Sequence, residues 1–188
     1  MRRRDPEGKR AAVIDAASTL FQADGFEATS AAAIASTAGV SEGIVFHYFG
    51  SKHGVLEACS NAAAAAFAGV EIKAHRDGID YHRLVTQTFE WLAEDRMIRR
   101  LWSEGDDRIV GALRRGWQGG IVPAVASVLV TEQEAGRCRA GDTTRLARMQ
   151  FAVMGGALTA HFDDPIAWPR EDAVAETAAL LRSLVAPA

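Results

Sequence analysis

The chain has 188 residues, of which 48% are hydrophobic and 24% charged, and its formal net charge is -3. This average composition excludes disordered and collagen-like chains, and a chain of this length buries roughly 70% of its unfolded surface on folding. The longest apolar stretch, residues 119–130, is too short to cross a bilayer, and no apolar signal-peptide segment follows the basic start. We therefore expect a globular cytoplasmic protein with no membrane partner.

Charge is distributed unevenly along the chain. Five of the first ten residues are Arg or Lys, including Arg2, Arg3 and Arg4, and two are acidic. Residues 55–188 carry 15 basic and 18 acidic side chains. A basic arm thus precedes an acidic body. The arm is either a solvated, frayed terminus or a segment that approaches nucleic-acid phosphates, and the sequence leaves both interpretations open.

The sequence contains no pattern typical of catalysis or metal binding. A glycine-rich phosphate loop, a Ser/His/Asp constellation, HExxH and CxxC are all absent, so we expect the chain not to be an enzyme. Cys59 and Cys138 are too few for a zinc site and are expected to be free thiols. His75, His82 and His161 lack metal-ligand spacing, and we expect neither a metal nor a cofactor.

Helical spacing of apolar residues dominates the sequence and predicts an all-α fold. Proline is absent from Glu7 to Val122, and alanine is abundant. A first helix is expected from about residue 6 to residue 23, ended by Gly25. Its buried face is formed by Val13, Ala17, Leu20 and Phe21.

Residues 29–52 predict two short helices joined by a tight turn. Thr29 or Ser30 caps the first helix, and Gly39 permits a left-handed turn. Ser41 caps the second helix, which is expected to end near His47. Together with the preceding helix they form a three-helix unit whose last helix can enter a major groove.

Further helices are expected downstream. Their apolar stripes cover about residues 84–95, 146–160 and 174–185. Residues 121–130 are interpreted as a buried helix that begins near Pro123. Gly119-Gly120 is expected to break or kink what precedes it.

Residues 9–57 carry a family pattern. The matching positions are Phe21, Gly25-Phe26, Thr29-Ser30, Ile34-Ala35, Ala38-Gly39-Val40-Ser41, Gly43, Tyr48-Phe49, Ser51-Lys52 and Leu56. Their order and spacing resemble the DNA-binding domain of the tetracycline repressor (TetR) family of bacterial regulators. The resemblance implies a helix-turn-helix DNA-binding domain over residues 1–54 and a larger helical ligand-binding and dimerisation domain over residues 55–188. It also implies one long helix from Lys52 to about Lys73.

The resemblance further implies roles for individual residues. The DNA-binding segment 41–47 would be the recognition helix, which starts at Ser41 and has base-contacting positions at Glu42, Gly43, Ile44 and His47. Phosphate contacts are implied at Thr29, Ser30, Tyr48 and Lys52. Three residues differ from the usual pattern: Phe46 replaces a tyrosine, Ala32 replaces a basic residue, and Glu42 adds a carboxylate near DNA.

The second domain offers candidate ligand-binding residues. They are Phe89, Trp91, Met97, Trp102, Trp117, Phe151, Met154 and His161, although any one of them is more often ordinary core. By the resemblance, helices near residues 143–162 and 171–185 form a homodimer interface, where Gly155-Gly156-Ala157 allows close approach. The alternative is that these helices only close the core of one chain.

These expectations converge on a ligand-responsive, sequence-specific DNA-binding transcriptional regulator. By the resemblance, it is a repressor that a small-molecule effector releases from operator DNA. The alternative is a helical small-molecule-binding module with weak or lost DNA binding, which the Phe46 and Ala32 replacements and the balanced charge of residues 1–54 favour.

Overall fold

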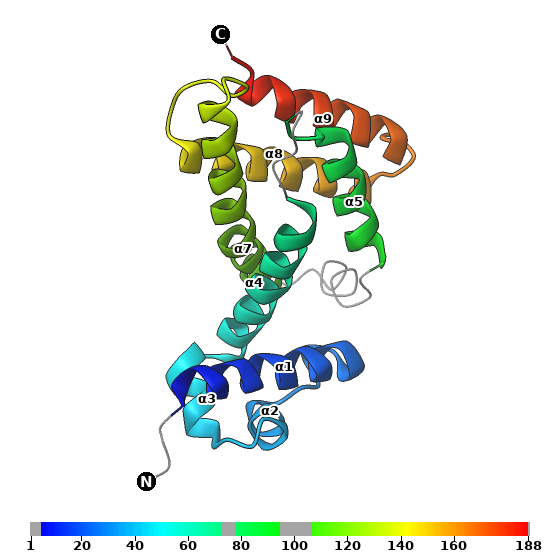
Figure 1. Ribbon diagram of the computed structural model, residues 1–188. Helices are drawn as coiled ribbons and strands as arrows, with labels where there is room; N and C mark the ends of the chain where they lie inside the picture. Colours follow the sequence, from blue (N-terminus) through cyan, green and yellow to red (C-terminus); the bar gives the residue numbers. More distant parts are fainter. Residues whose placement is uncertain (1–4, 73–77, 95–106, 188) are drawn as a thin grey trace. The chain divides into compact units, whose positions relative to one another are not determined.

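The computed structural model describes residues 5–72, 78–94 and 107–187, drawn in colour in Figure 1. Within these ranges the chain forms helices and turns and contains no strand. The all-α expectation is therefore confirmed. The chain divides into two compact units, Met1–Ala63 with Asp95–Trp117 and Ala64–Glu94 with Gln118–Ala188. The functional boundary expected between residues 54 and 55 stays a prediction.

The first unit contains three helices joined by short connections and parts of two longer helices. These are α1 (Pro6–Asp24), α2 (Ala31–Thr37), α3 (Glu42–Phe49), the start of α4 (Lys52–Glu71) and the start of α7 (Asp107–Glu134). Phe21, Phe26, Ile34 and Leu56 are among the largest fully buried side chains of its core. Ile109, Ala112 and Leu113 of α7 complete that core, a contribution the sequence did not indicate.

Local signals set the ends of the first helices. Asp5 caps α1 by accepting from the Gly8 amide over 2.8 Å, and Pro6 occupies the first turn, where its missing N–H costs nothing. Gly25 ends α1 with φ 86°. The expected first helix is confirmed. The second short helix, α3, extends to Phe49, two residues beyond the expected end.

Helix α7 corrects one expectation. It runs without a break from Asp107 to Glu134, so Gly119-Gly120 does not interrupt it and Pro123 lies inside it instead of near its start. Proline removes the hydrogen bond to the carbonyl four residues earlier, here that of Gly119. Gly119 is exposed, so water can bind that carbonyl, and buried Val122 and Val125 hold the helix on the core beyond it.

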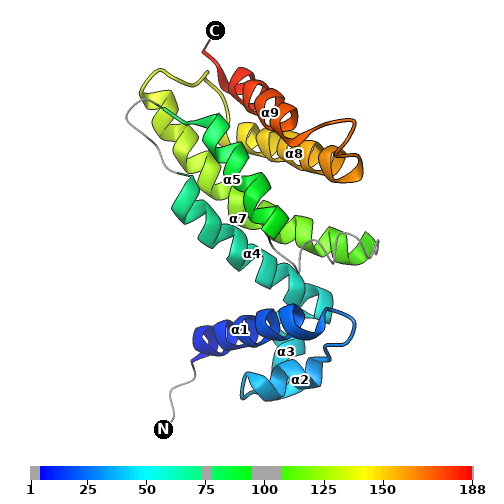
Figure 2. The same ribbon diagram turned by 90° about the vertical axis from the view of Figure 1, so that its right-hand side faces the viewer.

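The second unit contains α5 (Tyr81–Glu94), α8 (Thr143–Asp163) and α9 (Arg170–Val185), which lie side by side in Figure 2. The expected helices near residues 84–95, 143–162 and 171–185 are thereby confirmed. Gln150 joins all three helices, since its Nε2 donates to the Tyr81 hydroxyl over 2.8 Å and to the Leu181 carbonyl over 3.2 Å. Burial raises the pKa of Tyr81 to about 12.

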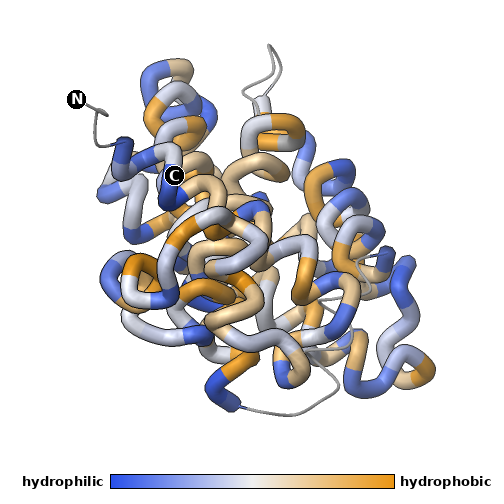
Figure 3. Tube along the Cα trace, turned by 90° about the horizontal axis from the view of Figure 1, so that it is seen from below, coloured by the Kyte–Doolittle hydropathy of each residue, from blue (hydrophilic) through white to orange (hydrophobic). Residues whose placement is uncertain are grey.

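The polarity of the helices matches their packing. In Figure 3 hydrophobic and hydrophilic positions alternate around the helices, as amphipathic helices require. Within the part of the chain that the structure describes, no helix combines the length and the apolar character needed to span a membrane.

Candidate nucleic-acid interface

The first unit contains a helix-turn-helix made from α2 and α3. Ser30 caps α2, because its hydroxyl accepts from the Ala33 amide over 3.1 Å. Gly39 adopts φ 66° in the turn, and the Val40 amide bonds the Ala35 carbonyl over 3.0 Å, which closes the end of α2. Of the two caps that the sequence left open, Thr29 and Ser30, the structure shows Ser30, and the predicted left-handed turn is confirmed.

Helix α3 buries one side and exposes the other. Val45 is 1% exposed and faces the core, while Ile44, Tyr48 and Phe49 are half-buried. The exposed face consists of Glu42, Gly43, Phe46 and His47. These positions are spaced so that a straight helix brings them to one side. The four residues therefore form a single surface, which we call the α3 face.

Two members of the α3 face have distinct chemistry. Phe46 is 44% exposed, an unusual fraction for a phenylalanine, and no sequence expectation placed it among the contact residues. The signal in the sequence that could have identified Phe46 is its position on a short helix, next to other positions expected to be exposed. His47 packs its ring 5.4 Å from that of Tyr48, so the face presents aromatic carbon and imidazole nitrogen side by side.

The hydroxyl residues divide into exposed and buried groups. Ser30 and Ser41 are exposed at the starts of α2 and α3, where helix N-terminal amides favour anions. Ser41 makes no side-chain cap bond, so its hydroxyl is available to another acceptor. Thr29 is only 2% exposed and donates to the Gly25 carbonyl over 2.7 Å. Thr29 thus stabilises the turn before α2 through its hydroxyl, and its phosphate contact stays a prediction.

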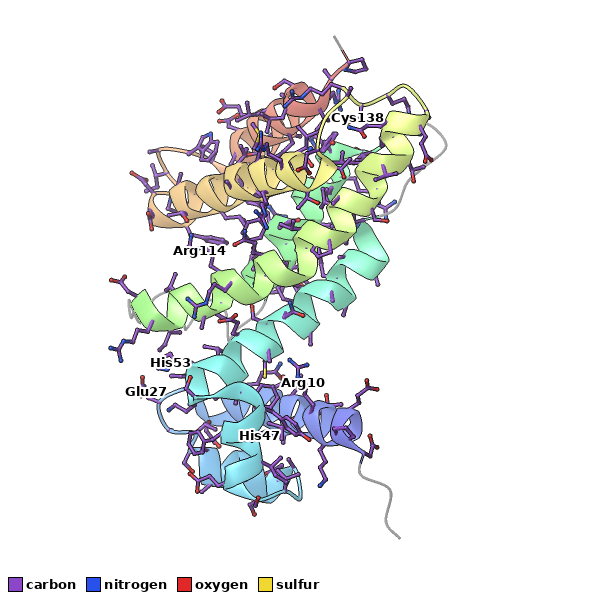
Figure 4. The ribbon with its side chains drawn as sticks, turned by 90° about the vertical axis from the view of Figure 1, so that its left-hand side faces the viewer. Arg10, Glu27, His47, His53, Arg114 and Cys138 are labelled. Carbon is purple, nitrogen blue, oxygen red and sulfur yellow. The ribbon has the colours of Figure 1, made fainter. Side chains whose placement is uncertain are left out.

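Lys52, at the start of α4, points into its own unit. Its Nζ donates to the Phe26 carbonyl over 2.8 Å and to the Glu27 carbonyl over 3.4 Å. The ammonium also lies 4.3 Å from the centroid of the Phe26 ring, and the His53 ring lies 4.9 Å from that ring. Figure 4 labels Glu27 and His53 in this region.

Arg10 on α1 is one of the five basic residues of the N-terminal arm, and the sequence did not indicate its contact within the fold. Its guanidinium carbon lies 5.2 Å from the centroid of the Phe49 ring at the end of α3, so a cation–π contact connects α1 to α3. Arg10 is exposed, and Figure 4 labels it together with His47 of α3. The only signal in the sequence for this contact was a basic residue in the second turn of a helix whose buried face was already predicted.

The predicted ligand-binding residues are only partly brought together. In the second unit Phe89 is buried, and its ring lies 5.4 Å from that of His161, whose Nδ1 donates to the Trp168 carbonyl over 2.9 Å. Trp91 lies 5.9 Å from the ring of Phe67, a residue that the sequence did not single out. Phe151 and Met154 are half-buried on α8, Trp117 belongs to the first unit, and Met97 and Trp102 lie outside the described residues.

The sequence comparisons concern mainly the first unit. Residues 13–59 match the model of the bacterial regulatory proteins of the tetR family. The HTH-type transcriptional regulator BetI of Vibrio atlanticus is 30% identical over 105 residues, 52% of this chain and 52% of that protein. BetI of Paraburkholderia phymatum is 46% identical over 52 residues, 28% of this chain and 26% of that protein. At most, the chain spans about half the length of these relatives.

Solved structures share the whole fold at low sequence identity. The R. erythropolis repressor QsdR, 14% identical, gives a TM-score of 0.73 and is covered over 94% of both chains. RolR bound to resorcinol is 19% identical and has a TM-score of 0.69, and the match covers 97% of this chain and 90% of that one. FadR of Thermus thermophilus in complex with lauroyl-CoA is 23% identical and has a TM-score of 0.65, and the match covers 93% of this chain and 92% of that one. The chain therefore matches the tetR family model over residues 13–59 and shares its fold with these solved regulators.

Proposed function

We propose that this chain is a ligand-responsive, sequence-specific DNA-binding transcriptional regulator, a repressor that a small molecule releases from its operator. The α3 face is the observation that carries the proposal. This helix side follows the turn at Gly39, and it exposes a carboxylate, a glycine, an aromatic ring and an imidazole. A cytoplasmic location follows from the proposed function, since bacterial chromosomes lie there.

Each residue of the α3 face has a counterpart on DNA. The Glu42 carboxylate accepts from a cytosine amino group, and His47 donates to or accepts from a purine edge. Gly43 lets the backbone approach the groove, and the half-buried Ile44 flanks the face. The exposed Phe46 ring suits a thymine methyl group. Hydroxyls for the phosphate contacts that fix the register come from Ser30, Ser41 and the half-buried Tyr48.

The effector would bind in the second unit, near Phe89, His161 and Trp91. RolR and FadR, which share the fold, were solved with resorcinol and lauroyl-CoA respectively. Aromatic and imidazole side chains favour a ligand that has an apolar or aromatic portion and one polar group. Phe151 and Met154 stay predicted contacts of the same ligand.

A homodimer formed through α8 and α9 completes the proposal. Met149 and Gly156 are exposed on α8, and Leu180 is 49% exposed on α9. Apart from its chain neighbours and the nearby backbone of α8, no atom of the described residues lies within 4 Å of a Cβ built at Gly155 or Gly156, which leaves room for the backbone of another helix. A two-fold dimer would present two α3 faces to half-sites about one helical turn of DNA apart.

The alternative function, a ligand-binding module with weak or lost DNA binding, draws on a specific observation. Lys52, the expected phosphate contact, directs its ammonium to internal partners, and Glu42 adds negative charge to the α3 face. The two functions differ in one property, which is a salt-dependent affinity for particular DNA sequences.

Selection of genomic fragments by the purified full-length protein tests the proposal. We expect enriched fragments to share a palindromic site. The logarithm of the association constant for this site should fall linearly with the logarithm of the salt concentration. Addition of the effector, found by screening small aromatic and acyl compounds for a rise in melting temperature, should release the fragment. Failure to bind any fragment at low salt would instead favour the alternative module.

A further inference from the structure

We propose that Lys52 is a positioning residue that holds the start of α2, and through it α3, against the start of α4, and that it does not contact a DNA phosphate. The inference rests on the proposed DNA-binding function for its consequence, but its structural part is independent of DNA. It also revises the phosphate role that the family resemblance implied for this residue.

The Lys52 ammonium has several partners within the first unit. An ammonium carries three N–H donors, and here the Phe26 carbonyl, the Glu27 carbonyl and the Phe26 ring lie at 2.8, 3.4 and 4.3 Å respectively. The Glu27 carboxylate, 3.9 Å away, neutralises part of the charge. The side chain is only 24% exposed. A phosphate would therefore have to displace contacts that already exist.

The position of Lys52 in its helix gives the same indication. Lys52 is the first residue of α4, and a cation at a helix N-terminus is opposed by the helix dipole. Two carbonyl oxygens at the end of another segment offset that repulsion. His53, the next residue, packs its ring 4.9 Å from that of Phe26, so consecutive residues of α4 contact the same side chain.

The turn that Lys52 contacts leads directly to the helix-turn-helix. The Phe26 carbonyl that accepts from Lys52 also accepts from the Thr29 amide over 3.3 Å. Thr29 precedes Ser30, the residue that caps α2. Lys52 therefore fixes the point at which the chain enters α2, and any movement of α4 at this end is passed to that point.

The Lys52→Met variant isolates the ammonium, since methionine keeps most of the apolar stem. Hydrogen exchange of the Thr29 amide is measured without DNA, and Lys9→Met, which removes a charge from an exposed α1 position, is the matched control. We expect exchange at Thr29 to rise about tenfold in Lys52→Met, the effect of one charged hydrogen bond, and to stay unchanged in Lys9→Met. Unchanged exchange in both would overturn the proposal, whether or not the protein binds DNA.

The DNA arm of the experiment separates three roles for Lys52. Affinity for a selected fragment is measured over a range of salt concentrations, with circular dichroism showing each variant folded. A positioning role predicts about tenfold weaker binding with an unchanged salt slope. A phosphate contact predicts a slope smaller by about 1.8 per dimer, and a role in stability alone predicts unchanged affinity. Either of these last two results would contradict the proposal.

Discussion

The hydroxyl of Ser60 donates a 2.8 Å hydrogen bond to the carbonyl oxygen of Leu113, which fastens α4 to α7 within the first unit. Arg115 adds a 2.7 Å bond from its Nε to the Glu57 carboxylate. Between these bonds Gly116 lies against the backbone of α4, so that a Cβ placed there would come 2.6 Å from the Ser60 Cβ. The crossing of α4 and α7 thus depends on a residue without a side chain.

Gly116→Ala is expected to destabilise the protein by about 1–3 kcal/mol, because the two backbones must separate to admit a methyl group. Gly111→Ala is the matched control on the same helix. A Cβ at Gly111 meets only the movable end of Arg115, at 3.3 Å, so alanine should stabilise the helix by about 0.5–1 kcal/mol. Urea denaturation midpoints measure both, and equal effects of the same sign would refute the close crossing.

Phe46→Tyr is expected to tighten DNA binding about three- to tenfold on all sequences alike. The exposed ring gains a hydroxyl that can donate to the DNA backbone, and one such bond has this net effect. Phe46→Leu, which keeps an apolar side chain without the hydroxyl, serves as the control and should not tighten binding. Fluorescence anisotropy with the selected site and with unrelated DNA measures both. A gain confined to one sequence would place the hydroxyl on a base instead.

Removal of the charges of Arg2, Arg3 and Arg4 is expected to reduce the salt dependence of DNA binding. Residues 1–54 hold six basic and six acidic side chains, and with Lys52 engaged internally these three arginines are three of the other five basic ones. Replacing all three arginines by alanine should lower the salt slope by about 0.9 for each phosphate that the arm no longer neutralises. An unchanged slope would assign the arm to solvent, the first of the two interpretations that the sequence leaves open.

The Tyr81 hydroxyl is expected to make stability fall at alkaline pH. Its pKa is about 12 in the folded protein, above the ordinary value near 10, because burial disfavours the phenolate. The unfolded chain therefore loses this proton first, so the contribution is complete below pH 10 and declines as pH rises toward 12.

Tyr81→Phe tests this dependence. The variant should be less stable at neutral pH, because Gln150 loses one acceptor, yet its stability should decline less between about pH 9 and about pH 11. Urea midpoints at the two pH values provide the comparison. Parallel declines in the two proteins would show that the hydroxyl ionises alike in both states.

Local signals explain why much of the first unit was predictable. The cap at Ser30, the turn at Gly39 and the end of α1 at Gly25 depend on residues within a few positions of each other, and the structure confirms all three. The exposed side of α3 follows from the same short-range geometry. The mapping of its residues onto bases came from the family resemblance and stays a prediction.

Long-range packing explains what the sequence did not reveal. The unbroken course of α7 through Pro123 depends on contacts with other helices, which override local propensity. The bond from Ser60 to Leu113 spans 53 positions, and the bond from Lys52 to the Phe26 carbonyl spans 26. No neighbouring residue indicates either bond. Long-range packing also decides which predicted ligand-binding residues meet, as the contact between the rings of Phe89 and His161 shows.

The most direct test of the account is the binding profile of His47→Ala on a selected operator and on its single-base variants. If the α3 face reads bases, replacing the base at one position of each half-site should cost the wild-type protein about 1–3 kcal/mol of binding free energy. His47→Ala should lose the base preference at that position and keep the preferences at all others. Ser30→Ala should instead weaken binding evenly across the series. A uniform loss for His47→Ala, with every base preference retained, would contradict the claim that this helix selects the sequence.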